Sequence, residues 1–286
     1  MPSTTEAEAQ VALKEFDSIF SVKGKVAVVT GGSRGLGLHA ASGLLQAGAS
    51  KVYITSRKAK ACEEAVAALN ALPNKAAGAK AISVPADSSK ISEIEALVKE
   101  VSKTTDHVDI LLANAGATWG ASFEKHPESA FSKVMDLNVK SVFYTVQKFG
   151  PLLEKNASQR DPSRVIITGS VAGIGTGTIG ENATFGYSAS KAAVLHLARN
   201  LAMELASKHI LVNSIAPGFF PSKMANGLME MMGGQENLAS LVPNGKLGEP
   251  EDFAATVVFL SSRAANHINA TTTVIDGGSI WARSSL

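Results

Sequence analysis

Short apolar runs alternate with longer helical stretches along almost the whole chain, and this alternation constrains the fold most. Runs with the composition of buried strands lie at residues 25–30, 52–55, 81–84, 109–113, 164–168, 210–215 and 272–275. Helical patterns lie between them, at residues 35–46, 61–72, 91–101, 128–153, 187–208 and 250–260. Strands joined by helices pair in parallel through right-handed crossovers, and such sheets need helices on both faces. The sequence therefore predicts an α/β fold with one Rossmann-type doubly wound parallel sheet.

Residues 1–23 precede this pattern and are predicted to form an N-terminal arm. Val11, Phe16, Ile19 and Phe20 would give the arm a short apolar face that docks on the body. Residues 24–286 contain no linker, repeat or low-complexity segment, so we expect one domain there. A chain of 286 residues that is 45% hydrophobic has enough apolar material for one large core.

Charge and cysteine content exclude several classes of function. The formal net charge is +2 with acidic and basic residues interspersed, so we expect no nucleic-acid partner and no membrane partner. Cys62 is the single cysteine, which excludes an intrachain disulfide and a cysteine zinc cluster. The six histidines lack metal-ligand spacing, so no metal site is predicted.

The ends of the chain bear on its location. No apolar run is long enough to span a bilayer, and the first residues lack the apolar core of a signal peptide. We therefore expect a cytoplasmic protein. The alternative is a peroxisomal location, because Ser284-Ser285-Leu286 is similar to the Ser-Lys-Leu address but lacks its central positive charge.

A glycine-rich turn, Thr30-Gly31-Gly32-Ser33-Arg34-Gly35-Leu36-Gly37, directly follows the first strand. A turn of this kind between a first strand and a first helix is typical of dinucleotide binding. Glycines let the backbone approach the pyrophosphate, and the free N–H groups of the helix N-terminus face the phosphates. The spacing differs from the general G-x-G-x-x-G fingerprint, because three residues separate the first and third glycines. We predict that the cofactor contacts Gly31, Ser33, Arg34, Gly35, Leu36 and Gly37.

The end of the second strand indicates which dinucleotide binds. An acidic residue there would bind the ribose hydroxyls of NAD. This chain instead has Ser56-Arg57-Lys58, and Arg34 lies in the glycine turn. Two guanidinium groups and a hydroxyl suit a 2′-phosphate, which an acid would repel. Both arginines could instead be solvated surface charges, but their joint position favours NADP(H).

Tyr187 and Lys191 lie one turn apart on the same face of the predicted helix. A free tyrosine keeps its proton to about pH 10, and a neighbouring positive charge lowers that pKa. Such a tyrosine could exchange a proton with a substrate oxygen near neutral pH. The same spacing also arises by chance, so the pair gains meaning from the cofactor turn.

These motifs, in this order, resemble those of the short-chain dehydrogenase/reductase superfamily from about residue 22 to the C-terminus. Thr30-Gly-x-x-x-Gly-x-Gly resembles its cofactor loop, and Asn114-Ala115-Gly116 its Asn-Ala-Gly after the fourth strand. Tyr187-x-x-x-Lys191 resembles its catalytic pair, and Asp276-Gly277-Gly278 its C-terminal signature. Within the superfamily the chain is most similar to β-ketoacyl and carbonyl reductases, of the fungal and yeast carbonyl reductase and rhamnolipid-type ketoacyl reductase branches.

The resemblance implies a role for several further residues. Ser170 would polarise the substrate carbonyl, Asn138 would support a water chain to Lys191, and Lys191 would hold the nicotinamide ribose. Ser222 stands where the family usually has a threonine that contacts the nicotinamide amide, and Asn269-Ala270 replaces a usual Thr-Gly. The implied catalytic residues are Asn138, Ser170, Tyr187 and Lys191. The implied cofactor contacts, beyond the glycine turn, are Ser56, Arg57, Lys58, Asp87, Asn114, Ala115, Gly116, Tyr187, Lys191, Pro217, Gly218 and Ser222.

We therefore expect NADPH-dependent reduction of a ketone to a secondary alcohol, with Tyr187 as the general acid. The expected substrate is a small or medium apolar ketone, or a β-ketoacyl group. One alternative is an alcohol dehydrogenase that works in the oxidative direction. Another is a dinucleotide-sensing protein without turnover.

Two segments would shape the substrate site. The glycine-rich residues 173–186 form either a mobile or a closely packed loop before Tyr187. Met224, Leu228, Met231 and Met232 have helical spacing and could cover an apolar substrate, or could pack as an ordinary surface helix. The family also implies a homodimer or homotetramer, through two-fold pairing of the helices that carry Asn138 and Tyr187.

Overall fold

A computed structural model describes residues 6–221 and 233–282 of the chain. Seven parallel strands form one sheet in the order β3-β2-β1-β4-β5-β6-β7. The predicted doubly wound α/β fold is confirmed. The strand order reverses between β1 and β4, which pair directly, and ligands of such sheets bind at this point beyond the carboxyl ends of the strands. The strands are β1 Val26–Thr30, β2 Lys51–Thr55, β3 Lys80–Ser83, β4 Ile110–Ala113, β5 Ser163–Thr168, β6 Ile210–Pro217 and β7 Thr272–Ile275.

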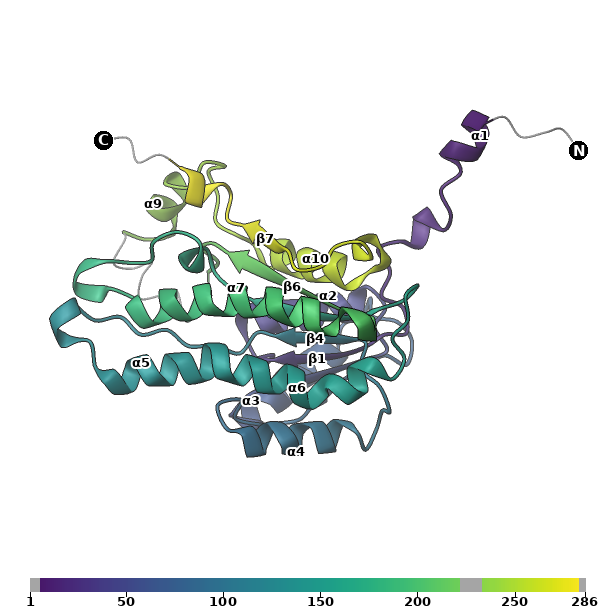
Figure 1. Ribbon diagram of the computed structural model, residues 1–286, viewed down its shortest axis with the longest axis horizontal. Helices are drawn as coiled ribbons and strands as arrows, with labels where there is room; N and C mark the ends of the chain where they lie inside the picture. Colours follow the sequence, from purple (N-terminus) through teal and green to yellow (C-terminus); the bar gives the residue numbers. More distant parts are fainter. Residues whose placement is uncertain (1–5, 222–232, 283–286) are drawn as a thin grey trace, which may run out of the picture.

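Helices cover both faces of this sheet (Figure 1). Side chains of α2, α3 and α10 share one buried cluster with the strands, and those of α4, α6 and α7 share the other. Neighbouring residues of β1 illustrate the division, because Val28 belongs to one cluster and Val29 to the other. The helices are α1 Glu6–Val11, α2 Gly35–Gln46, α3 Ala59–Asn70, α4 Ile91–Val101, α5 Glu128–Met135, α6 Ser141–Glu154, α7 Phe185–Leu205, α9 Gln235–Ser240 and α10 Pro250–Ser261.

The long helix predicted at residues 128–153 contains a π-helical turn. Asp136–Lys140 has π geometry between α5 and α6, and the N–H of Ser141 donates to the carbonyl of Asp136, five residues back. Such turns insert one extra residue and frequently occur at functional sites. Asn138 lies in this turn and is 1% exposed.

The turn before β7 contains a left-handed alanine. Ala270 has a φ of 61°, at the position where the family usually has glycine. Alanine in this conformation costs about 1–2 kcal/mol. Two hydrogen bonds hold the turn in place, since Val212 N–H donates to the Asn269 side chain (2.9 Å) and Ala270 N–H donates to Val212 O (2.9 Å).

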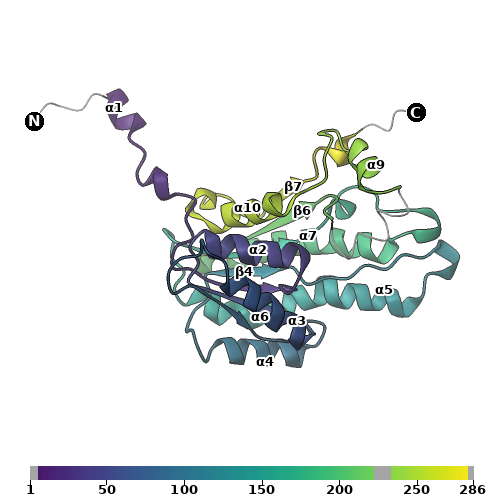
Figure 2. The same cartoon turned by 180° about the vertical axis from the view of Figure 1, so that it is seen from behind.

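Among the described residues, the N-terminal arm contacts the body from Glu15 onward, where Glu15 pairs with Arg263. Figures 1 and 2 show α1 projecting away from the body. Phe20 packs against Phe259 of α10 with ring centroids 6.4 Å apart, and Ala264 N–H donates to the carbonyl of Ile19 (3.1 Å). Val11 and Phe16 are exposed, so the prediction that they also dock is wrong. Polar contacts attach this part of the arm instead, because Glu15 pairs with Arg263 and the carbonyl of Ile19 accepts from Ala264 N–H.

Within residues 6–221 and 233–282, no helix is both long and apolar enough to cross a bilayer. Three predicted features lie outside the described residues: Ser222, the methionine-rich segment 224–232, and the C-terminal Ser284-Ser285-Leu286. The division into an arm at residues 1–23 and one domain at 24–286 stays a prediction.

Candidate active site

Tyr187 and Lys191 lie on the first turns of α7, as predicted. The Lys191 Nζ is 5.6 Å from the centroid of the Tyr187 ring. It donates a hydrogen bond of 2.7 Å to the carbonyl of Thr168, the last residue of β5. Lys191 is 5% exposed, so the end of β5 holds its ammonium group away from water.

Ser170 places a second hydroxyl beside the tyrosine. It lies just beyond β5, is buried, and forms a side-chain hydrogen bond with Tyr187. Its Oγ also accepts from the backbone N–H of Ala172 (3.2 Å), which fixes its direction. Two hydroxyl donors that converge in this way can both reach one carbonyl oxygen and stabilise its developing negative charge.

The electrostatics of the pair differ from the prediction. Burial raises the pKa of Tyr187 above its usual value, and the hydrogen bond with Ser170 lowers it by less. Burial also lowers the pKa of Lys191 from its ordinary 10.5 to about 8. The predicted lowering of the tyrosine pKa by Lys191 is therefore wrong for the protein alone. Each group is removed from water, which disfavours its charged form, and the lysine ammonium points to Thr168.

Asn138 is held by its side-chain amide. Its Oδ1 accepts from Ala117 N–H, and its Nδ2 donates to Ala117 O and to Ser190 Oγ, all at 2.9 Å. A Cβ added to Gly116 would lie 3.1 Å from the amide oxygen of Asn138 and 3.7 Å from the Nζ of Lys191. Asn138 and Lys191 therefore flank the same glycine.

The glycine turn has no room for a side chain at Gly37. A Cβ on Gly37 would lie 2.4 Å from the carbonyl oxygen of Gly31 and 2.6 Å from the Nδ2 of Asn114. Gly31 has a φ of 65° and Gly35 a φ of 53°, values that favour glycine. The resulting cradle of backbone N–H groups at the start of α2 suits a pyrophosphate.

Asn114 joins this turn to the catalytic side. Its Nδ2 donates to the carbonyl of Thr30 (3.1 Å), and its Oδ1 accepts from the hydroxyl of Thr168 (3.2 Å). The carbonyl of the same Thr168 holds Lys191. A continuous set of hydrogen bonds therefore connects the predicted cofactor turn with Lys191.

The predicted adenosine end lies where the glycine turn meets β2. The N–H of Gly32 donates to the carbonyl of Thr55 (3.1 Å), so Arg34 and Arg57 belong to adjacent loops, and both are exposed. Burial would raise the pKa of Asp87, but hydrogen bonds from Ser89 and the charges of Arg57 and Lys90 outweigh it and lower that pKa. Arg57 therefore acts electrostatically on Asp87, which the resemblance includes among the cofactor contacts.

The other two residues of the basic segment differ from each other. Ser56 Oγ lies 3.1 Å from the sulfur of Cys62, a contact inside the protein. Lys58 is exposed just before α3. The glycine cradle and the two arginines fit a dinucleotide with a 2′-phosphate.

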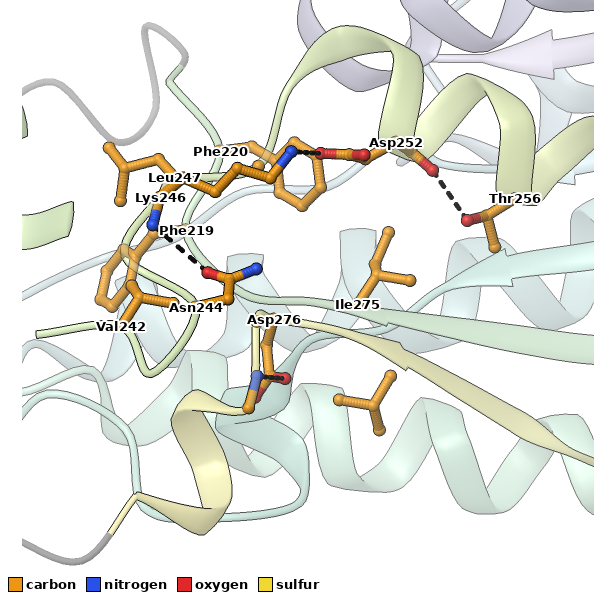
Figure 3. A pocket seen from close by; sticks show the side chains of 14 residues that line it. Phe219, Phe220, Val242, Asn244, Lys246, Leu247, Asp252, Thr256, Ile275 and Asp276 are labelled. Carbon is orange, nitrogen blue, oxygen red and sulfur yellow. Dashed lines mark hydrogen bonds and ion pairs between the residues drawn. The ribbon is translucent and has the colours of Figure 1, made fainter.

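On the nicotinamide side, Pro217 ends β6 and Gly218 follows it. Gly218 is closely packed, since an added Cβ would lie 2.7 Å from the Cβ of Asp276. A cavity of about 330 Å³ lies beyond this turn, between β7, the start of α10 and the loop at residues 242–248. Figure 3 shows Lys246 reaching toward Asp252 at its rim and Asn244 within it. None of Ser170, Tyr187 and Lys191 lines this cavity, so the assignment of the site rests on their geometry.

Two loops border the predicted catalytic residues, at 114–122 and 173–184. They contact each other, because Ala121 N–H donates to the carbonyl of Ala183 (3.1 Å). The second loop is closely packed on α7, since a Cβ on Gly173 would lie 2.5 Å from the carbonyl carbon of Lys191. Trp119 and Ile179, one on each loop, are 47% and 77% exposed. Glu181 is the one charged residue in these two segments.

Three residues of the site were not predicted. Thr168 and Ala117 act mainly through backbone atoms, which no side-chain pattern reveals. Ser190 lies inside the Tyr187–Lys191 segment, and its position three residues after the tyrosine, on the same helix face, is the signal that could have found it.

The chain is similar to known proteins in both sequence and structure. The family model described as short chain dehydrogenase matches residues 25–233. The chain is 42% identical over 259 residues to the rhamnolipids biosynthesis 3-oxoacyl-[acyl-carrier-protein] reductase of Pseudomonas aeruginosa, covering 91% of this chain and 97% of that protein. It is 31% identical over 266 residues to the 5-keto-D-gluconate 5-reductase of Escherichia coli, covering 93% and 99%. A solved Pseudomonas aeruginosa RhlG/NADP active-site complex matches with a TM-score of 0.84 and 41% identity, over 92% of this chain and 98% of that one.

Proposed function

Because this chain belongs to the short-chain dehydrogenase family and is an NADP-dependent oxidoreductase, we propose that it reduces a ketone to a secondary alcohol. The observation that carries the proposal is the hydrogen-bonded Ser170 and Tyr187 pair with Lys191 beside it. A site of this composition can bind a carbonyl oxygen and protonate it.

The chain's own residues would bind the cofactor at the switch point of the sheet. The cradle from Gly31 to Gly37 would take the pyrophosphate, and Arg34 and Arg57 the 2′-phosphate. Bound NADPH supplies the hydride that the carbonyl carbon accepts. Pro217, Gly218 and Ser222 stay predicted contacts on the nicotinamide side.

Ser170 and Tyr187 would act on the substrate oxygen. Ser170 donates a hydrogen bond to the carbonyl and stabilises the negative charge that develops there. Tyr187 transfers its proton to that oxygen, and its raised pKa keeps it protonated and ready to donate at neutral pH. Lys191 keeps a positive charge beside the phenol, which stabilises the phenolate left after transfer. Asn138 would support the return of a proton through water toward Lys191.

The loops that border the site favour an apolar substrate. Their exposed side chains include Trp119 and Ile179, and their one charge is the negative Glu181. A sugar acid such as 5-keto-D-gluconate carries a carboxylate, which this charge would repel and which prefers a guanidinium or ammonium partner. We therefore propose a small or medium apolar ketone. A β-ketoacyl group is the second candidate, favoured by the 42% identity to a 3-oxoacyl reductase.

Loss of NADPH absorbance, measured over a panel of ketones, tests this function. The panel contains methyl ketones of increasing chain length, a β-ketoacyl thioester and 5-keto-D-gluconate. We expect the highest kcat/KM with an apolar ketone or the thioester, and loss of turnover in Tyr187→Phe. Turnover confined to the sugar acid would overturn the substrate class. Turnover with NADP⁺ and alcohols alone would favour the oxidative alternative, and binding of NADPH with no turnover would favour a sensor.

We further propose a homo-oligomer, either a dimer or a tetramer. Phe131, Phe143 and Met203 expose apolar side chains on α5, α6 and α7, the helices whose pairing the family implies. Light scattering on the purified chain would give the mass, and a monomer at micromolar concentration would contradict this proposal. The cytoplasmic location stays a prediction.

A further inference from the structure

We propose that Ser190 is a positioning residue of the active site, which joins Asn138 to the helical turn that bears Tyr187. The inference rests on the proposed function, in which Asn138, Tyr187 and Lys191 act together. It assigns to the side chain between the two catalytic residues of α7 a task that the resemblance does not give it.

The hydroxyl of Ser190 makes two directed hydrogen bonds. It accepts from the Nδ2 of Asn138 (2.9 Å) and donates to the carbonyl of Tyr187 (2.7 Å). Ser190 is 0% exposed, so water cannot replace either partner. A hydroxyl has one hydrogen to donate, and here it is committed to the tyrosine backbone. The direction of both bonds is therefore settled by the structure.

The orientation of the Asn138 amide is equally determined. Ala117 offers it one N–H and one carbonyl, which fixes which end is oxygen and which is nitrogen. The two hydrogens of Nδ2 then go to Ala117 O and to Ser190 Oγ. Removing the serine hydroxyl would leave one buried N–H without its partner, a change that costs roughly a factor of 5 to 100 in an equilibrium.

This bond matters to the chemistry because of what lies on each side of it. On one side, Asn138 flanks Gly116 together with the Nζ of Lys191. On the other, the backbone of Tyr187 sets the direction of the phenol toward Ser170. A shift of the amide therefore disturbs the surroundings of Lys191 and the approach of Tyr187 at the same time.

Ser141 provides a matched control. It is also buried, and its hydroxyl also donates to a carbonyl one turn back, that of Leu137. It begins α6 directly after the π-helical turn that holds Asn138. Ser190→Ala and Ser141→Ala thus remove the same kind of helical bond, but only the first removes a partner of the Asn138 amide.

The test is a double-mutant cycle on the full chain, with the ketone that the panel identifies. We expect Ser190→Ala to lower kcat roughly 10-fold with little change in the KM for NADPH, and to move the pH dependence of kcat. Asn138→Ala should lower kcat at least as much, because it also removes the two bonds to Ala117. The double variant should lose little more than Asn138→Ala alone, because the bond between Ser190 and Asn138 is then already absent. Ser141→Ala should retain the native kcat and pH profile. Additive losses, or equal effects of the two serine variants, would overturn the proposal.

Hydrogen exchange separates this inference from the proposed function, since it needs no turnover. Ser190→Ala should increase exchange of the Ala117 amide, which the Asn138 side chain accepts, and of the first turns of α7. Ser141→Ala should leave the Ala117 amide protected. If the native chain reduces no ketone but Ser190→Ala still speeds exchange at Ala117, the proposed function is refuted and the positioning role of Ser190 is supported. Unchanged exchange at Ala117 in Ser190→Ala would refute the positioning role of Ser190.

Discussion

Gly37→Ala places one methyl group at the most crowded point of the cofactor turn. The added Cβ would lie 2.4 Å from the carbonyl oxygen of Gly31 and 2.6 Å from the Nδ2 of Asn114. Ordinary contacts of this kind are about 3.5 Å or longer, so one of the two neighbours must move. The first is backbone in a turn with positive φ, and the second is a side chain bound at both ends.

The loss of unfolding free energy depends on which neighbour moves. Overpacking a well-packed site costs about 1–3 kcal/mol. Displacing Asn114 would also weaken its bonds to Thr30 O and to the hydroxyl of Thr168, each worth about 1 kcal/mol net. We therefore expect Gly37→Ala to lower the free energy of unfolding by about 2–4 kcal/mol. The NADPH Kd should rise at least roughly 10-fold, because the turn that would hold the pyrophosphate opens.

Urea denaturation and fluorescence titration with NADPH measure the two effects separately. Gly150→Ala is the control, since an alanine Cβ there meets no atom within 4 Å beyond its chain neighbours and the residue lies inside α6, away from the cofactor turn. It should leave the Kd unchanged; the helix gain of alanine over glycine is opposed there by Pro151, which disfavours a helical residue with a Cβ before it, so we expect a change in the free energy of unfolding smaller than that of Gly37→Ala. A Gly37→Ala protein with native stability and native NADPH affinity would refute the steric argument and the location of the pyrophosphate together.

Three further predictions concern charge and backbone. Arg57→Asp should lower the ratio of kcat/KM with NADPH to that with NADH by about 10- to 100-fold, as steady-state kinetics with both cofactors will measure; an unchanged ratio would exclude Arg57 as the 2′-phosphate partner. Ketone reduction should fall as pH rises through about 8, where Lys191 loses its proton, and a rate constant that stays flat to high pH would contradict this role. Because the folded pKa of that lysine lies below its unfolded value of 10.5, the unfolded chain binds more protons between these values, so this group favours folding increasingly as pH rises there. Ala270→Gly should raise the free energy of unfolding by about 0.5–1 kcal/mol, because it removes a left-handed alanine. Thermal unfolding should therefore show a higher Tm, and a lower Tm would contradict this reasoning.

The fold was predictable because apolar residues recur along the chain with the spacings of buried strands and amphipathic helices. Strands buried on both faces must be apolar throughout, and Val28 and Val29 of β1 indeed enter opposite clusters. The π-helical turn at Asp136–Lys140 was not predictable, since one inserted residue shifts the apolar phase too little to register in the pattern of residues 128–153. The exposure of Phe16 was also missed, because an apolar side chain indicates a preference for burial but not the presence of a partner.

The placement of Tyr187 and Lys191 was predictable, but their electrostatics were not. Spacing alone brings Tyr187 and Lys191 onto one face of α7, and the structure confirms it. Their pKa values depend on how much water each group retains and on where the ammonium points. Burial and the carbonyl of Thr168 decide both, and neither is written in the spacing of two side chains.

The link between the predicted cofactor turn and Lys191 is visible only in three dimensions, because its residues lie at the ends of different strands. It runs from Lys191 Nζ to Thr168 O, from the Thr168 hydroxyl to Asn114 Oδ1, and from Asn114 Nδ2 to Thr30 O. These residues are up to 161 positions apart, but β5, β4 and β1 are neighbours in the sheet, so their carboxyl ends meet. Both ends of the Asn114 amide are hydrogen-bonded within the protein, so its side chain is better placed to connect β1 with β5 than to contact the cofactor directly. Asn114→Ala removes both of these bonds and should therefore disturb Lys191 as well as NADPH binding. A loss of kcat equal to the loss of NADPH affinity would show that Asn114 connects the two regions, whereas a loss of NADPH affinity alone would show a residue that only binds cofactor.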